Sequence, residues 1–296
     1  MTHRDFIRGL PRGTLADLSR LSNGPGLRHL AMHVLLILAG GVWIGLGLPF
    51  WPLVLIVQGI VLSFLFTLEH EATHRTPFAT PWINEWVGRL AGLLIFLPFE
   101  WFRHFHLAHH KYTNVPGKDP ELIEGAKPET WPAYVLYVSG LRYWSGNARQ
   151  ILRNAFGEKS ADDYVPGAAR GRVRTEARIM LGVYAVAFAS LVFSPVLFWI
   201  WILPLVIGQP FLRLYLLAEH GRCAFVANMF ENTRTTLTNR AVRFLAWNMP
   251  YHVEHHSLPR VPFHRLPDLY RLMQGHHVHL APSYRSITAD LVRTLK

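Results

Sequence analysis

Two long apolar regions, separated by a polar segment, dominate the pattern of the chain. Residues 30–68 contain a single ionisable side chain, His33, and residues 180–217 contain a single charged one, Arg213. Each region is long enough for two helices that cross a bilayer, at roughly 20 residues per crossing, and each has a Gly- or Pro-containing break near its middle. The pattern therefore predicts four membrane-spanning helices in two hairpins, at about residues 30–49, 51–70, 177–193 and 196–217.

A fifth apolar segment, residues 90–99, is too short to span and is flanked by Arg89, Glu100 and Arg103. We expect it to be a helix that lies in the membrane interface. The predicted fold is an all-α membrane protein with four transmembrane helices, interfacial helices and a cytoplasmic helical cap. The expected division is an N-terminal cytoplasmic segment, a membrane domain and a C-terminal tail, at residues 1–29, 30–275 and 276–296.

The basic residues are placed asymmetrically around the two hairpins. The chain has 30 Lys and Arg against 19 Asp and Glu, a net charge of +11. Five of these basic residues precede the first hairpin, thirteen lie between the hairpins and ten follow the second, whereas the two outer turns have none. The positive-inside rule then predicts that both termini and the central segment face the cytoplasm. The charge therefore indicates topology, and binding to nucleic acid is not needed to explain it.

The composition removes several classes of protein and of site. Only 17% of the residues are charged, below the roughly 25% of soluble chains, and the many aromatic residues exclude an intrinsically disordered chain. A single cysteine, Cys223, excludes an internal disulfide framework, a Cys-ligated zinc site and an iron–sulfur cluster held by this chain alone.

Histidine is the unusual residue type, with 17 copies. Nine of them lie in three clusters and one isolated position, all at inner ends of spans or in cytoplasmic segments of the predicted topology. They are His70, His74, His106, His109, His110, His220, His252, His255 and His256. Because positions i, i+3 and i+4 share a helix face, we expect each cluster to aim two or three imidazoles at one point. Nine ligands exceed the four of a tetrahedral zinc and suit two metals.

The remaining histidines lie outside this spacing. We interpret seven of them as surface, interface or tail groups: His3, His29, His33, His264, His276, His277 and His279. His104 precedes His106 by two residues and falls on another helical face, so its role stays open.

The three boxes, HxxxH, HxxHH and HxxHH, together with the hairpins, resemble the membrane fatty-acid desaturase superfamily of di-iron desaturases and hydroxylases. The similarity covers about residues 30–275. It includes the run His109-His110-Lys111-Tyr112-Thr113-Asn114 before Asp119-Pro120, and the run Trp247-Asn248-Met249-Pro250-Tyr251-His252. The segment after the third box, which includes Pro259, Pro262 and Pro267, resembles bacterial acyl-lipid desaturases and carotenoid-modifying relatives. The resemblance therefore implies an integral protein of the bacterial cytoplasmic membrane, with its metal site on the cytoplasmic side.

The resemblance also implies the chemistry. Two iron ions would use O2 to abstract hydrogen from an unactivated carbon of a lipid-type substrate, and an acyl-lipid desaturase is the leading expectation. A carotenoid or small-metabolite hydroxylase, ketolase or desaturase of the same superfamily is the alternative. His220 resembles the additional ligand that the family places after its last span. Because the metal ions would carry out the chemistry, no side chain is assigned as catalytic. The candidates for residues that contact and orient the histidine ligands are Asp119, Glu254, Asn248, Glu71 and Glu219.

Electrons must come from outside the chain. The sequence has no GxGxxG dinucleotide fingerprint and no cysteine set for a cluster. We therefore expect an external donor of ferredoxin, rubredoxin or cytochrome type with its reductase. Such carriers are usually acidic, and the basic cytoplasmic segments would attract one.

Two readings from other classes stay open. The first box also satisfies HExxH, the pattern of zinc peptidases in which Glu71 would act as general base beside His70 and His74. A non-catalytic metal carrier in the membrane is the other reading, although transporters place their ligands within spans and these clusters lie at or beyond the span ends.

Overall fold

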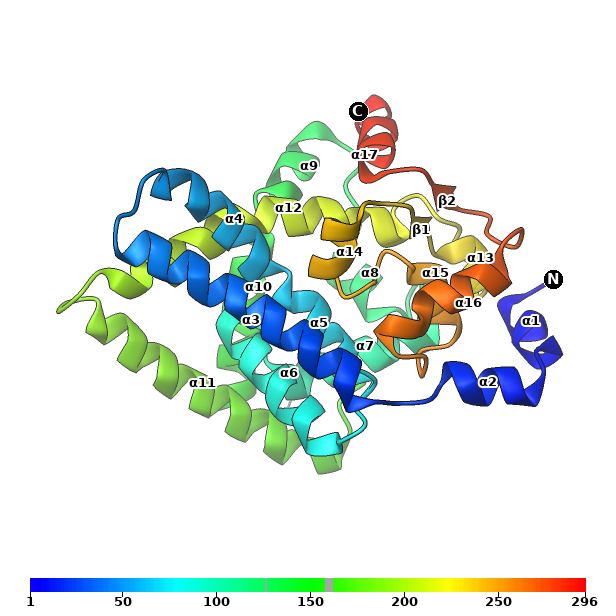
Figure 1. The fold of residues 1–296 in the computed structure, drawn as a ribbon, viewed down its shortest axis with the longest axis horizontal. Coiled ribbons are helices and arrows are strands. Elements are labelled where there is room, and N and C mark those ends of the chain that lie inside the picture. The colour runs from blue at the N-terminus through cyan, green and yellow to red at the C-terminus, as the bar shows by residue number, and fades with distance from the viewer. Residues whose placement is uncertain (126, 158–161) are drawn as a thin grey trace.

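The computed structural model describes residues 1–125, 127–157 and 162–296, and helices form most of these residues (Figure 1). The apolar regions contribute α3 (Asn23–Gly45), α4 (Trp51–Ser63), α5 (Leu65–Thr73), α11 (Arg170–Ser190), the π-helical turn η2 (Phe198–Ile202) and α12 (Leu203–His220). The polar segments contribute α1 (His3–Gly9), α2 (Arg12–Leu18), α6 (Pro81–Ile95), α7 (Phe99–Tyr112), α8 (Pro120–Glu124), α9 (Trp131–Val138), α10 (Leu141–Phe156), η1 (Gly167–Ala169), α13 (Met229–Asn232), β1 (Thr235–Thr236), α14 (Arg240–Leu245), α15 (His252–Ser257), η3 (Phe263–Arg265), α16 (Leu266–Met273), β2 (Leu280–Ala281) and α17 (Tyr284–Arg293).

Three stretches of helix among the described residues are long and apolar enough to cross a membrane. They are Arg12–Gly45, Trp51–Thr73 and Phe198–His220; the second contains the expected span 51–70, and the other two overlap most of the expected spans 30–49 and 196–217. The remaining expected span, residues 177–193, falls mostly in α11, whose first half carries Arg172, Arg174 and Arg178. The structure is therefore that of a mostly helical membrane protein with three candidate spans, and the fourth span stays a prediction.

Two glycines allow α4 and α12 to approach closely. A Cβ atom on Gly208 would lie 2.0 Å from the carbonyl oxygen of Gly59, and one on Gly59 would lie 2.2 Å from the carbonyl oxygen of Pro204. The hydrophobic effect does not hold helices together in lipid. Small residues at a crossing instead let the two backbones pack closely, and this packing stabilises the helix pair. This crossing fixes the position of α12, the helix that ends at His220.

Buried polar side chains add hydrogen bonds between the apolar helices. The amide of Gln58 on α4 donates to the carbonyl oxygens of Ile37 at 3.1 Å and Ile200 at 3.3 Å. The ring of His33, fully buried on α3, pairs with the carbonyl oxygen of Val61 at 2.9 Å. Since backbone groups in lipid find few other partners, these contacts fix α3, α4 and η2 as one unit.

The short apolar segment at residues 90–99 is divided between two helices, whereas we expected a single interfacial helix. Helix α6 ends at Ile95, because Phe96 adopts a left-handed conformation with φ of 63°. Pro98 then caps the start of α7 at Phe99. The break turns the chain back, so that α6 and α7 both pack against α5.

The segments that follow α12 gather at the end of the spans, on the right of Figure 1. There β1 pairs in parallel with β2, with Thr235 opposite Leu280, and α17 packs against α12. Residues beyond 275 thus form ordered structure around the end of α12. The expected domain limits at residues 29/30 and 275/276 stay predictions.

Candidate metal centre

Four helix ends carry the nine clustered histidines to one place. His70 lies on α5 and His74 caps its end, His106, His109 and His110 lie on the last turns of α7, His220 ends α12, and α15 carries His252, His255 and His256. Seven of the nine are buried with at most 4% exposed, while His74 and His110 are half-buried. A shared core that includes Leu68, Trp101 and Trp247 packs behind these helix ends.

Eight of the nine form two groups able to hold a metal ion. In the first group, one ring nitrogen from each of five side chains lies within 4.8 Å of the others: His70, His74, His106, His110 and His255. In the second group, His109, His220 and His256 meet the same limit. The ninth, His252, has its Nε2 atom 3.1 Å from Nε2 of His220, which places it beside the second group.

The adjacent pairs in the second and third boxes divide between the groups. His109 and His256 belong to the second group, whereas His110 and His255 belong to the first. This differs from our expectation that each box aims at one point. Consecutive residues on a helix point about 100° apart, so each HH pair faces two centres at once.

The separations of the ring nitrogens match a shared metal. Two ligand nitrogens bound at about 2.1 Å lie roughly 3.0–3.4 Å apart at bond angles of 90–109°. The Nε2 atoms are 2.9 Å apart in His74 and His106, 3.2 Å in His110 and His255, and 3.3 Å in His109 and His220. The residues therefore fit metal ions at both groups.

The hydrogen bonds on the far side of the rings show which nitrogens face inward as acceptors. Nδ1 of His109 lies 2.9 Å from the carboxylate of Asp119, and Nδ1 of His220 lies 3.1 Å from the carbonyl oxygen of Asn232. Both oxygens only accept, so each neutral ring places its proton on Nδ1. When both rings are neutral, the two Nε2 lone pairs face one another at 3.3 Å, an arrangement that a cation between them stabilises.

Burial keeps most of these rings neutral, which metal binding requires. It lowers the pKa of His74 and of His255 to about 3 in each case, and the pKa of His106, His110 and His256 well below the ordinary value. At neutral pH these imidazoles therefore offer lone pairs.

His109 is the exception among these rings. Burial acts to lower the pKa of this ring, but the carboxylates of Glu121 and Asp119 outweigh it and raise the pKa above its usual value. The surroundings of His109 thus favour positive charge at this point.

Three of the five expected supporting residues face ligand rings. Besides Asp119, Glu71 has its Oε1 atom 3.3 Å from Nδ1 of His255, and Glu219 has its Oε1 atom 3.4 Å from Nδ1 of His252. Glu71 is held in turn by the hydroxyl of Thr76, which donates at 2.7 Å. Of the three, Asp119 makes a hydrogen bond to its ring, and a carboxylate in that position fixes the tautomer and orientation of a ligating histidine.

Two other expected residues make different contacts. Glu254 accepts from the hydroxyl of Thr235 at 2.6 Å and pairs with Nε2 of His277 at 2.5 Å, so it ties α15 to β1 and to the C-terminal segment. The amide of Asn248 donates to the carbonyl oxygen of Phe263 at 3.0 Å. His104, which we left open, lies outside both groups of histidines.

Several histidines outside the boxes are interior, rather than the surface, interface or tail groups of our interpretation. His3 is buried and bonded to Asn228, His33 is fully buried, and the side chain of His277 is only 2% exposed. Each has a hydrogen-bond partner and stabilises packing. Others fit the interpretation better, such as His276, which is half-buried and stacks on Phe230.

Two residues near the site were missed by sequence reasoning. The Oε2 atom of Glu121 lies 3.4 Å from Nδ1 of His109, and its other oxygen forms an ion pair with Lys127. The ammonium of Lys127 holds the pKa of Glu121 below its usual value against the opposing effect of burial. The only signal in the sequence was the position of Glu121 two residues after Asp119, and Lys127 gave none.

Comparison with known proteins agrees with this geometry. The profile of the family described as fatty acid desaturase matches residues 46–287, a range that contains all nine clustered histidines. The chain is also similar to the sn-1 oleoyl-lipid 12-desaturase of Arthrospira platensis, with 23% identity over 270 residues, 82% of this chain and 75% of that protein. Because the family profile covers most of the chain, the resemblance is confirmed and the protein belongs to the fatty acid desaturase family.

Proposed function

We propose that this protein is an O2-dependent desaturase that introduces a double bond into the acyl chain of a membrane lipid, using two iron ions held by the nine histidines. The observation that carries the proposal is the pair of inward-facing Nε2 atoms of His109 and His220, 3.3 Å apart, beside a separate group of five histidines. In the balanced reaction, –CH2–CH2– reacts with O2, two electrons and two protons to give –CH=CH– and two water molecules.

Each iron has its own ligand set in this proposal. His70, His74, His106, His110 and His255 hold one ion, and His109, His220, His252 and His256 hold the other. When bound, the ions supply the activation of O2 that removal of hydrogen from an unactivated carbon requires. The carboxylate of Asp119 and the carbonyl oxygen of Asn232 keep the ring protons of His109 and His220 on Nδ1, and the buried surroundings exclude bulk water from the reacting carbon.

A lipid substrate is supported by the surroundings of the site and by the relative. The histidines lie at the ends of candidate spans, and the name of the similar protein describes an oleoyl-lipid substrate. The HExxH reading loses support, because Glu71 is fully buried, accepts a hydrogen bond from Thr76 and faces His255.

The proposal includes a fourth span and an orientation. On α11, Ile179, Val183 and Val186 form one stripe at helical spacing, and they are 61%, 41% and 71% exposed. Such a stripe suits contact with lipid. With α11 crossing the membrane, both termini and the histidines lie on the cytoplasmic side of a bacterial cytoplasmic membrane, where an external carrier supplies the electrons.

Expression in a bacterial host that also makes a ferredoxin and its reductase tests the function. Lipid mass spectrometry should show acyl chains lighter by about 2 mass units per new double bond. Cells with His255→Ala serve as the control and should lack these chains. Products heavier by about 16 mass units would favour the hydroxylase alternative instead, and unchanged lipids and pigments would contradict the proposal.

A further inference from the structure

We propose that a pocket between the end of α12, β2 and α17 is the docking site for an acidic protein that carries single electrons. This inference rests on the proposed function, because the desaturation reaction consumes two electrons for each O2. It adds the place on this chain where the electron donor binds and the residues that bind it.

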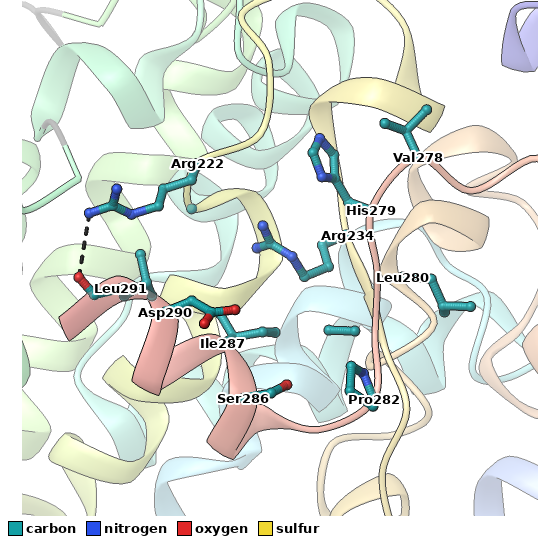
Figure 2. Close-up of a pocket in the computed structure, with 12 residues that line it drawn as sticks. Arg222, Arg234, Val278, His279, Leu280, Pro282, Ser286, Ile287, Asp290 and Leu291 are labelled. Carbon is teal, nitrogen blue, oxygen red and sulfur yellow. Dashed lines mark hydrogen bonds between the residues drawn. The ribbon is translucent and has the colours of Figure 1, made fainter. Parts of the chain in front are cut away.

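The pocket has a volume of about 340 Å³ and is shown in Figure 2. Gly221 and Arg222, which follow α12, form one wall, and Ile287 and Leu291 of α17 form another. The side chain of Arg234 projects between these walls in the figure. The pocket is thus built from three segments that are far apart in the sequence and meet at the end of α12.

Two arginines in this pocket lack a carboxylate partner. Arg222 is exposed and donates to the carbonyl oxygen of Leu291 at 3.4 Å, and Arg234 donates to the carbonyl oxygen of Ala218 at 2.6 Å. Neither forms an ion pair with any residue that the structure describes. The acidic side chain in the lining, Asp290, is exposed and lies 3.7 Å from Arg293. The exposed guanidinium of Arg222 is therefore available to a carboxylate of a partner, and the half-buried Arg234 adds positive charge beside it.

The pocket shares its wall with the second group of histidines. Gly221 directly follows His220, whose ring faces His109. The backbone N–H of Arg234 donates to the carbonyl oxygen of Glu219 at 2.8 Å, and the carboxylate of Glu219 faces His252. A protein bound at Arg222 would lie within two residues, along the chain, of a proposed iron ligand.

The pocket is formed by the segments that follow the candidate span Phe198–His220, next to the short strands and α17. Its unpaired basic groups complement the acidic surface of an electron carrier. Val278 and Leu280 in its lining are 60% and 44% exposed. Basic groups among exposed apolar ones suit a small, transient interface of the kind that redox partners form.

Binding of acidic electron carriers to the purified protein in nanodiscs tests the proposal. The probes are a [2Fe–2S] ferredoxin, a rubredoxin and a cytochrome b5-type protein, each titrated at low salt and at about 0.15 M salt. We expect at least one to bind, more weakly at the higher salt. Arg222→Glu should raise its Kd at least about tenfold, which is about 1.4 kcal/mol. Arg222→Lys, which keeps the charge, should retain most of the affinity.

The matched control is Arg12→Glu, which makes the same charge change at an exposed arginine on α2. It should leave Kd nearly unchanged. An equal loss in both Glu variants, or no binding of any carrier to the wild-type protein, would overturn the docking site. Loss of binding of Arg222→Glu to anionic vesicles, with carrier binding intact, would assign the pocket to lipid headgroups and overturn it as well.

The outcome is separable from that of the proposed function. Iron content and a single turnover, in which the protein is reduced with dithionite without O2, freed of excess dithionite and then mixed with O2, do not depend on a carrier, so both should be the same in Arg222→Glu and the wild-type protein. Absence of desaturation in this single turnover of the wild type would contradict the function, whereas the binding results would still decide the docking site.

Discussion

The imidazole rings of His110 and His256 stack with their centroids 4.0 Å apart and their planes 5° from parallel. His110 belongs to the group of five histidines and His256 to the group of three. The stack therefore joins the two groups at their boundary and connects α7 with α15. Two metal ions on either side of this stack would be neighbours in one centre rather than independent sites.

Asp119→Asn should weaken the second metal group. The carboxylate accepts from Nδ1 of His109 at 2.9 Å, and an amide at this position can present its NH2 group instead and favour the wrong tautomer. We expect iron affinity or activity to fall roughly 10–100-fold, measured by metal titration and by product formation. Asp163→Asn, at an exposed carboxylate, is the control. Equal values for both variants would remove Asp119 from the supporting role.

Lys127→Met should destabilise the folded protein. The ion pair with Glu121 is intermediate in burial between a surface pair and a fully buried pair, since the side chains of Lys127 and Glu121 are 18% and 33% exposed. Removal of the cation should cost about 2 kcal/mol, between the values for exposed and for buried pairs. The thermal midpoint at a fixed scan rate should fall. The double variant Lys127→Met/Glu121→Gln should recover part of the lost stability. If the losses of the two single variants simply add in the double variant, the two side chains do not stabilise the protein through their ion pair.

Gly208→Ala should disturb the crossing of α4 and α12. The added methyl group would lie 2.0 Å from the carbonyl oxygen of Gly59, which is backbone and cannot move alone. Overpacking of this kind costs about 1–3 kcal/mol, so the thermal midpoint should fall. Gly182→Ala on α11 is the matched control, because its Cβ atom meets nothing within 4 Å. A fall of equal size in the control would mean that the crossing is not the cause.

Cys223 should be unreactive in the native protein. Burial raises the pKa of its thiol to about 11, and the side chain is only 5% exposed. At pH 8 about one thiol in a thousand is then a thiolate. Alkylation by iodoacetamide, followed by mass spectrometry, should be more than about a hundredfold slower than in the unfolded chain. The native rate should keep rising through about pH 10, and a plateau above about pH 9.5 would indicate an ordinary, exposed thiol.

The histidine spacing was a sound guide to the site because it depends on local helix geometry. Positions such as His106, His109 and His110 are fixed relative to one another by the helix alone. The division of His109 and His110 between two groups was not predicted, since it depends on where α15 and the end of α12 lie. Three of the four expected spans were also readable, because runs of apolar residues long enough to span a membrane have few other uses.

Contacts between segments that are distant in the sequence could not be predicted from the sequence. Lys127 contacts Glu121 although it lies outside the helix that contains Glu121, and no periodic pattern in the sequence predicts this contact. Glu254 was expected beside a ligand ring, but it pairs with His277 from a segment interpreted as a tail. In both cases the partner is chosen by tertiary packing, and a carboxylate next to a histidine in the sequence need not face that histidine in space.

The metal content of the purified protein tests the two-iron site most directly. Inductively coupled plasma mass spectrometry should find two iron ions per chain in the wild type, reduced iron in His109→Ala and in His255→Ala, and unchanged iron in His276→Ala, where the ring stacks on Phe230 outside both groups. His109 and His255 come from different groups, so each variant weakens a different ion. One zinc and no iron in the wild type, or an equal loss of iron from all three variants, would contradict the assignment.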